Sequence, residues 1–181
     1  MKFFYTPWVH WPETMCTYVP ELKTLFSCDF FGSHLATSDL FVTDAAQVYE
    51  AAKRYFSEIM MPFSKTIVRN LAKVAALDFD LIAPGHGPAF DNPAMIVDAY
   101  HEWTGPKMKN EVVLPYISMH GSTKLMVDYL IDALAMRGVK VLPFDLAVTD
   151  IGKLAMSLVD TATIIIGTPT VHVGVHPLVH Y

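Results

Sequence analysis

The stretch Lys23–His34, KTLFSCDFFGSH, decides how the first part of the chain is interpreted. Its apolar run has the composition of a β-strand and ends at a carboxylate, Asp29, which can therefore reach a site at the edge of a sheet. Two histidines occupy similar settings, His10 in TPWVHWPETM and His86 in LIAPGHGPAF, each near a proline or glycine that ends regular structure. Together the three residues predict a metal site on three loops. Spacings this long are not diagnostic, so the alternative is that Asp29 caps a turn and both histidines are ordinary loop residues.

The bulk composition excludes several classes of protein. The chain has 181 residues, enough for one medium domain or two small ones, and its net charge of −5 comes without a basic run that could bind nucleic acid. Hydrophobic residues make up 52% of the chain, yet no apolar run approaches the roughly 20 residues of a membrane span. The first residues lack the pattern of a signal peptide, and the two cysteines form no disulfide framework. We therefore expect a cytoplasmic protein with reduced thiols.

The first hundred residues predict a β-meander followed by helices. Strands are expected over residues 2–5, 14–19 and 23–28. Asp44 is expected to cap a helix over residues 45–60 that Pro62 stops. A second helix over 63–76, a short buried strand over 78–83 and a third helix over 93–103 complete this part.

The second part of the chain alternates strands with helices. A polar stretch with a Gly-Pro break predicts a linker at 105–110, between domains at 1–104 and 111–181. Strands over 111–118, 139–145 and 162–167 enclose helices over 122–137 and 150–158, which predicts an α/β fold with a parallel sheet. Because a doubly wound domain normally supplies five strands, we expect the sequence to stop within this domain.

The loop between the first parallel strand and its helix has the chemistry of a phosphate site. It consists of Ser118, Met119, His120, Gly121, Ser122 and Thr123. Hydroxyls and backbone N–H groups at a helix N-terminus can cradle a phosphate, and Gly121 permits the close turn. The loop matches neither the P-loop nor the dinucleotide fingerprint, so FMN fits better than ATP or NAD. The alternative is a simple helix cap by Ser122.

A second loop follows the third parallel strand, where parallel sheets bind ligands. Its residues are Thr168, Pro169, Thr170, Val171, His172 and Val173. Two loops at one edge can share a ligand, whereas the alternative for this segment is a proline turn toward the next helix.

Imidazole and carboxylate suit zinc or non-haem iron, and Asp29 could bridge two metals because a carboxylate has two oxygens. Glu13, His34 and His101 are weaker candidates. His34 could instead form a hydrogen bond to a metal ligand and so orient it, or it could be an ordinary surface histidine.

The chain resembles the flavodiiron proteins, also called A-type flavoproteins, along nearly its whole length. The resemblance rests on TPWVHWPETM, LFSCDFFGSH, IAPGHGP, the linker, PYISMHGST and IIIGTPT, which occur in the family's order. It implies a partial metallo-β-lactamase-like αββα domain followed by a partial flavodoxin-like doubly wound parallel sheet. By position, His10 resembles a ligand to one iron, Asp29 the carboxylate bridging two non-haem irons, and His86 a ligand to the other.

The resemblance also implies an activity and partners. Ser118–Thr123 resembles the FMN phosphate loop and Thr168–Val173 the loop near the isoalloxazine, in an enzyme that reduces O₂ to water or NO to N₂O. The electron donor in such an enzyme is a rubredoxin-type protein or a reduced deazaflavin. The flavin of one subunit faces the iron site of another in a head-to-tail homodimer or tetramer.

Two departures from the family pattern lead us to expect an internal fragment. The family's HxExDH metal motif occurs nowhere in the chain, and the last third of the flavodoxin-like domain is absent. Two other functions therefore stay open: an FMN-binding electron-transfer module without metal catalysis, and a metal-dependent hydrolase of the β-lactamase-like fold. The FMN loop argues against the hydrolase.

Overall fold

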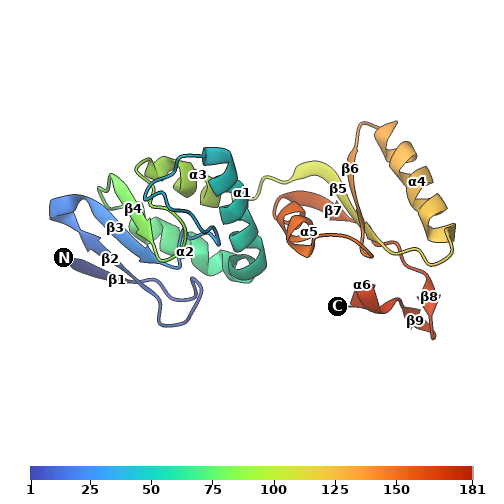
Figure 1. The fold of residues 1–181 in the computed structure, drawn as a ribbon, viewed down its shortest axis with the longest axis horizontal. Helices are drawn as coiled ribbons and strands as arrows, with labels where there is room; N and C mark the ends of the chain where they lie inside the picture. Colours follow the sequence, from blue (N-terminus) through green and yellow to red (C-terminus); the bar gives the residue numbers. More distant parts are fainter. Residues whose placement is uncertain (181) are drawn as a thin grey trace. The chain divides into compact units, whose positions relative to one another are not determined.

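The computed structural model describes residues 1–180 and divides into two compact units, Met1–Pro106 and Lys107–Tyr181 (Figure 1). Each unit is built on a sheet of its own. No helix in the described part of the chain combines the length and the apolar character needed to cross a membrane.

The first unit is built on a four-stranded sheet in the order β1-β2-β3-β4. Its strands are β1 (Lys2–Tyr5), β2 (Met15–Val19), β3 (Thr24–Cys28) and β4 (Leu81–Pro84), and a short 3₁₀ turn (Pro20–Leu22) joins β2 to β3. The first three strands pair antiparallel, which confirms the predicted meander. The fourth pairs parallel with β3, so β3 and β4 end at the same edge of the sheet.

The two faces of this sheet differ in burial. Cys16, Leu25 and Ile82 point to one face and are fully buried, whereas Phe3 and Phe26 are exposed. The register places Phe3 opposite Thr17 and Thr17 opposite Phe26, so the exposed side chains share a face.

A nearly continuous helical segment follows the sheet. Helix α1 (Ala45–Tyr55) begins as predicted at Asp44, whose carboxylate accepts a hydrogen bond of 3.0 Å from the Gln47 backbone N–H. It passes into a π-helical turn (Phe56–Met60), a 3₁₀ turn (Met61–Phe63) and α2 (Ser64–Val74). The segment Ala45–Met60 ends where predicted, and Pro62 lies in the first positions of the following 3₁₀ turn, where its missing N–H breaks no essential bond.

Aromatic side chains fill the space between the helices and the Asp29 turn. Helix α3 (Pro93–Thr104) contributes Tyr100 and Trp103, and both rings lie within about 5.3 Å of the Phe56 ring. Phe30 and Phe31, the residues after Asp29, pack edge-on against Tyr100. The turn that carries Asp29 is thus backed by the core rather than by solvent.

The second unit is a three-stranded parallel sheet in the order β6-β5-β7. Its elements are β5 (Lys109–Tyr116), α4 (Ser122–Ala135), β6 (Lys140–Asp145), α5 (Ile151–Leu158) and β7 (Thr161–Ile164). This order confirms the predicted β-α-β-α-β pattern and the α/β class. Strand β5 begins at Lys109, inside the stretch predicted as linker, because Lys109 bonds to Asp160 through both its backbone N–H and its ammonium group.

The segment after β7 differs from the predicted loop. Thr170–Val171 and Gly174–Val175 form a two-stranded hairpin, β8 and β9, followed by α6 (Pro177–His180). His172 and Val173 make its turn with φ angles of +47° and +67°. Positive φ at both central residues is typical of the tight turns that suit a two-residue hairpin loop.

Candidate metal site and flavin loops

Asp29 is held at the edge of the first sheet by the loop that carries His86. The Gly85 backbone N–H donates to the Cys28 carbonyl at 2.6 Å, and the Ser33 N–H donates to the His86 carbonyl at 3.2 Å. A Cβ at Gly85 would lie 3.3 Å from the Cys28 carbonyl oxygen, so the absence of a side chain permits this close approach. The parallel pair β3 and β4 therefore delivers both residues to one place.

His10 reaches the same place from the loop between β1 and β2. Asn70 of α2, which is buried, donates from its side-chain amide to the Pro7 carbonyl at 2.9 Å, and the Trp8 ring stacks on Phe63. Within the loop, the Trp8 N–H donates to the Trp11 carbonyl at 2.7 Å. These contacts fix the loop from the helical side of the unit.

The three predicted metal ligands meet around the Asp29 carboxylate. His10 Nε2 lies 3.5 Å from Asp29 Oδ2, and His86 Nε2 lies 3.2 Å from Asp29 Oδ1. The two imidazoles thus approach different oxygens of one carboxylate. Asp29 is 15% exposed, His10 25% and His86 48%, which leaves the site open on the His86 side.

The spacing of this donor set is compatible with two metal ions, one beside each carboxylate oxygen. Metal bonds of about 2.0–2.2 Å to nitrogen and oxygen place neighbouring ligands roughly 3.0–3.5 Å apart, which matches both Nε2–O distances. Among residues 1–180, no group of three or more His, Cys, Asp or Glu side chains surrounds a single point at which an ion could be held. Each half of the site offers one imidazole and one carboxylate oxygen, so both ions would need further ligands.

Tyr55 and His34 line the site behind His86. The ring of His34 packs edge-on against Tyr55 at 4.6 Å and against His86 at 5.6 Å. The Tyr55 hydroxyl is buried and finds no hydrogen-bond partner within the described residues. Burial raises the pKa of this phenol, and the negative charge of Asp29 raises it further.

The weaker candidates behave differently. His34 touches His86 by ring packing and makes no bond to Asp29, whereas neither Glu13 nor His101 pairs with the three central residues in the described part of the chain. Sequence reasoning missed Tyr55, because its spacing in α1 matches that of ordinary core positions.

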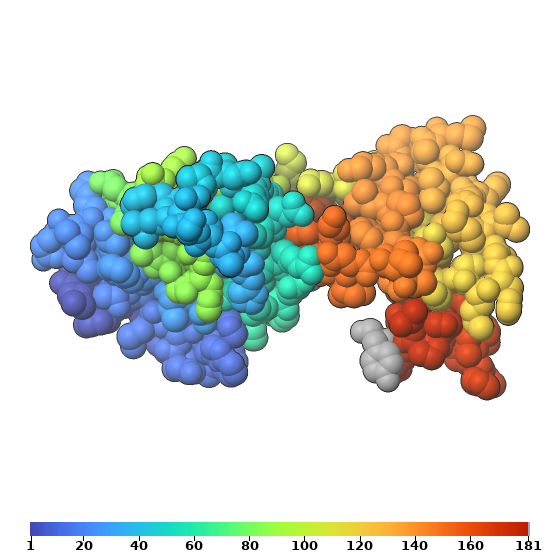
Figure 2. Space-filling model, viewed as in Figure 1, coloured from blue at the N-terminus to red at the C-terminus, as the bar shows by residue number. Residues whose placement is uncertain are grey.

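In the second unit, the two predicted flavin loops lie at the same end of the sheet. The Gly167 N–H donates to the Pro115 carbonyl and the Ile117 N–H to the Gly167 carbonyl, both at 2.9 Å. A Cβ at Gly167 would lie 3.5 Å from the Thr123 side chain. In Figures 1 and 2 the yellow loop before α4 and the red hairpin β8–β9 occupy this end of the unit.

The helix that follows the first loop begins in a way that leaves room for an anion. Gly121 precedes it with φ +86°, and Ser122 is its first residue, so the alternative of a cap by Ser122 is wrong. The Lys124 N–H donates instead to the Ser118 hydroxyl at 3.3 Å. The remaining N–H groups of the first turn have no acceptor within the helix and can serve a phosphate.

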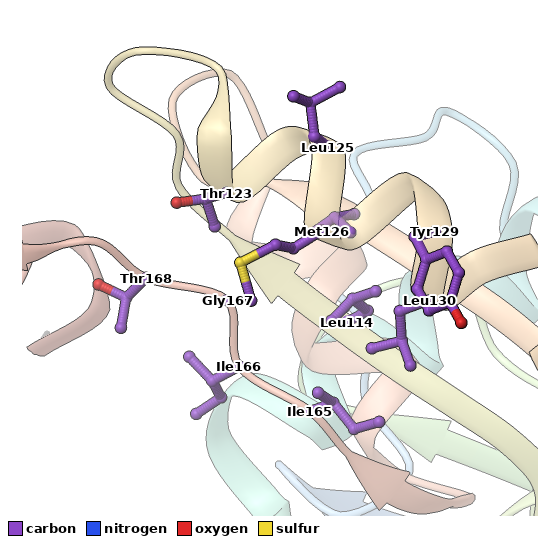
Figure 3. Close-up of a pocket in the computed structure, with 11 residues that line it drawn as sticks. Leu114, Thr123, Leu125, Met126, Tyr129, Leu130, Ile165, Ile166, Gly167 and Thr168 are labelled. Atoms are coloured by element: carbon purple, nitrogen blue, oxygen red, sulfur yellow. The ribbon is translucent and has the colours of Figure 1, made fainter. Parts of the chain in front are cut away.

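A cavity of about 590 Å³ starts at these loops and runs along α4 (Figure 3). Thr123 and Thr168, one from each predicted loop, line its polar end. The rest of the wall is apolar, formed by Leu114, Leu125, Met126, Val127, Tyr129, Leu130, Ile165 and Ile166 beside Gly167. Of the six residues predicted in each loop, one therefore borders this cavity.

Taken together, the first unit has the strand and loop arrangement of a metallo-β-lactamase-like domain and the second that of a flavodoxin-like domain. The family model described as ODP family beta lactamase matches residues 1–87. The nitric oxide reductase of Moorella thermoacetica is 34% identical over 184 residues, an alignment that covers 99% of this chain and 46% of that protein.

Two solved structures are similar along 99% of the chain. They are the rubredoxin oxygen:oxidoreductase of Desulfovibrio gigas, with a TM-score of 0.93 at 27% identity, and the flavodiiron protein of Giardia intestinalis, with 0.92 at 30%. This chain covers 46% and 45% of them. The chain is similar to flavodiiron proteins along nearly its whole length, and it spans about half the length of the relatives it matches.

Proposed function

We propose that this chain contributes to a flavodiiron oxidoreductase that reduces O₂ to water, NO to N₂O, or both. The observation that carries the proposal is the position of Asp29, whose two oxygens face two different imidazoles at 3.5 and 3.2 Å. Non-haem iron binds imidazole and carboxylate ligands, and a carboxylate with one imidazole on each oxygen suits a bridge between two ions.

The residues would divide the work between two sites. His10 and Asp29 would hold one iron, and Asp29 and His86 the other, while Ser118–Thr123 and Thr168–Val173 would hold FMN. Bound iron would supply the redox chemistry on O₂ or NO, and FMN would supply the electrons. The Asp29 charge would offset part of the charge of two bound cations, and the buried aromatic wall behind it would keep water away from that side.

The phosphate of FMN would sit at the N-terminus of α4, where the first N–H groups lack helical acceptors. We further propose a rubredoxin-type protein or a reduced deazaflavin as electron donor and a head-to-tail homodimer or tetramer as the assembly. The name of the Desulfovibrio gigas relative, a rubredoxin oxygen:oxidoreductase, supports the first donor.

Anaerobic reconstitution tests this function. The purified chain is incubated with ferrous iron and FMN, desalted, and assayed for iron, for flavin absorption and for consumption of O₂ and NO with a chemical reductant. Bound iron and flavin with consumption of either gas supports the proposal. Absence of all three contradicts it for this chain.

A second candidate function is an FMN-binding electron-transfer module without metal catalysis. It is favoured by the absence, within residues 1–180, of three His, Cys, Asp or Glu side chains around one point. Reconstitution distinguishes this module from the oxidoreductase. The module would bind FMN that can be reduced and reoxidised, but it would bind no iron and consume neither O₂ nor NO.

A further inference from the structure

The loop that carries His10 is closed at its base by two buried threonines. It leaves the sheet after β1 and returns at β2, and there the Thr6 N–H donates to the Thr14 carbonyl at 3.0 Å. The Thr14 hydroxyl donates in turn to the Trp11 carbonyl at 2.9 Å, inside the loop. The base of the loop is therefore a hydrogen-bonded unit within the core.

The turn that presents Asp29 is closed by a pair of bonds of its own. The Phe30 N–H donates to the Ser27 carbonyl at 3.1 Å, and the Ser27 hydroxyl donates to the Phe30 carbonyl at 2.6 Å. Cys28, the residue before Asp29, has a φ angle of +55°, in a region that residues other than glycine rarely adopt. Contacts from neighbouring segments must help to hold a turn of this shape.

Cys16 lies between these two closures, on the strand between β1 and β3. Its thiol donates to the Ser27 carbonyl at 3.7 Å between sulfur and oxygen, and its sulfur lies 3.5 Å from the Thr6 hydroxyl oxygen. Because β2 and β3 run antiparallel with Thr17 opposite Phe26, the thiol faces the next residue of β3. One side chain thus touches the base of the loop and the closure of the turn.

The hydrogens along this path can be assigned. The Cys16 thiol has one hydrogen, which its bond to Ser27 uses, so its sulfur accepts from Thr6. Thr6 shares its hydroxyl hydrogen between the sulfur and the Thr14 carbonyl, 3.4 Å away. Burial raises the pKa of Cys16 to about 11, which keeps the thiol protonated at neutral pH. The side chains of the path are fully buried, so they form one connected polar route through the core: Thr6, Cys16 and Ser27.

We propose that Cys16 is a positioning residue whose thiol couples the loop of His10 to the turn of Asp29. It does so by accepting a hydrogen bond from Thr6 and donating one to Ser27. The third ligand segment is placed separately, by the parallel pairing of β3 with β4. The consequence of the coupling for metal binding rests on the proposed function, whereas the coupling itself does not.

Amide hydrogen exchange, measured by NMR on the metal-free chain, tests the coupling. Thr6→Val removes only the hydroxyl at one end of the path, and we expect the Phe30 amide at the other end to exchange several-fold faster. Thr24→Val is the matched control, because Thr24 is also buried and its hydroxyl donates to the Leu22 carbonyl at 2.9 Å, outside the path. It should leave the Phe30 amide unchanged relative to global stability.

Two replacements of Cys16 separate hydrogen bonding from packing. Cys16→Ala removes the sulfur, and we expect faster exchange at both the Thr6 and the Phe30 amides. Cys16→Ser keeps a donor and an acceptor and should restore most of the protection at both. Ile96→Val removes one methyl group from a buried position of α3 and should lower overall stability without selective exposure of either amide.

Unchanged exchange of the Phe30 amide in Thr6→Val, after correction for global stability, would overturn the inference. Equal exchange in Cys16→Ala and Cys16→Ser would also overturn it, because packing alone would then explain the effect. If Cys16→Ala does not fold, the comparison of Thr6→Val with Thr24→Val decides.

Ferrous iron titration of the same proteins measures the consequence for the site. Cys16→Ala should bind iron several-fold more weakly than Cys16→Ser and Ile96→Val. Wild-type affinity in Cys16→Ala would overturn the positioning role. If no protein, the wild type included, binds iron while Thr6→Val still exposes the Phe30 amide, the proposed function fails and the coupling stands.

Discussion

His86 Nε2 lies 3.2 Å from Asp29 Oδ1, although the two residues belong to different loops. Parallel pairing of β3 and β4 brings the loops to one edge, and His10 Nε2 approaches the other oxygen, Oδ2, at 3.5 Å. The carboxylate is therefore shared between two imidazoles on opposite sides. This arrangement makes the contribution of each histidine separable by experiment.

Replacing either histidine should empty one half of the site. In His10→Ala and in His86→Ala, we expect about half of the iron bound by the reconstituted wild-type chain, because each ion loses one of its few protein ligands. Iron analysis together with flavin absorption measures this. His101→Ala, a change on the exposed surface of α3, is the control and should retain all of the iron. Full occupancy in both single variants would remove these histidines from the ligand set.

Gly121→Ala should weaken FMN binding through backbone strain. Gly121 has φ +86° and open space where a Cβ would project, so crowding plays no part. Alanine would cost about 1–2 kcal/mol in this conformation, which corresponds to roughly 5- to 30-fold weaker FMN binding if the loop must keep it. Quenching of flavin fluorescence measures the affinity.

Gly138→Ala is the matched control for this change. Gly138 has φ +74° and equally open space, but it follows the other end of α4. It should lose similar stability without affecting FMN. Equal FMN affinities in the two variants would mean that the Ser118–Thr123 loop does not hold the cofactor.

Asn70→Ala should destabilise the first unit. The buried side-chain amide of Asn70 donates to the Pro7 carbonyl, and its oxygen accepts from Lys73 at 3.1 Å. Losing these partners leaves the partly buried Pro7 carbonyl unpaired, at about 1–3 kcal/mol. Urea denaturation measures the loss, and Arg69→Ala, an exposed change in the same helix, should stay within about 0.5 kcal/mol of the wild type. A loss below that limit in Asn70→Ala would show that the amide does not anchor the His10 loop.

The two cysteines should differ in reactivity. Burial raises the pKa of Cys16 from 9.0 to about 11, partly offset by its hydrogen bond with Thr6, whereas Cys28 is exposed. At pH 8 the Cys16 thiolate fraction is then roughly 0.1%, so iodoacetamide should modify Cys28 alone in the folded chain and both thiols in urea. Mass spectrometry of digested protein counts the sites. Rapid labelling of Cys16 in the folded chain would contradict this burial.

The same shift has a consequence for stability at high pH. Because the folded-state pKa of Cys16 exceeds its ordinary value, its protonated form contributes stability that is fully present below about pH 9. That stability is lost as the pH rises toward 11. Cys16→Ala should therefore flatten the decline of the unfolding free energy between these pH values.

Several features of the fold could be predicted because local patterns and tertiary structure agree. The strands of the first unit, the Asp44 cap and the β-α-β-α-β order all follow from apolar periodicity and end signals. Pro62 indicated the end of the segment Ala45–Met60 correctly, because a proline suits the first turn of a new helical segment. The hairpin β8–β9 was missed because two-residue strands carry no periodicity.

The site was predictable only in outline. Loop positions led us to predict that His10, Asp29 and His86 share a site, and the structure brings the three side chains together; the sequence carries no information on which carboxylate oxygen faces which imidazole. The orphaned hydroxyls of Tyr55 and Tyr100 were invisible for a different reason. Both residues occupy helix positions whose spacing matches ordinary core packing, and only three-dimensional contacts show that their oxygens lack partners.

The bridging role of Asp29 is best tested by the iron content of Asp29→Asn after anaerobic reconstitution with ferrous iron and FMN. We predict that this variant loses iron from both halves of the site while keeping FMN, because an amide removes the negative charge and one of the two ligand oxygens between His10 and His86. Asp39→Asn, a change at an exposed carboxylate that accepts a hydrogen bond from Thr43, controls for the loss of a charge. Wild-type iron content in Asp29→Asn would contradict the bridging role and with it the proposed diiron centre.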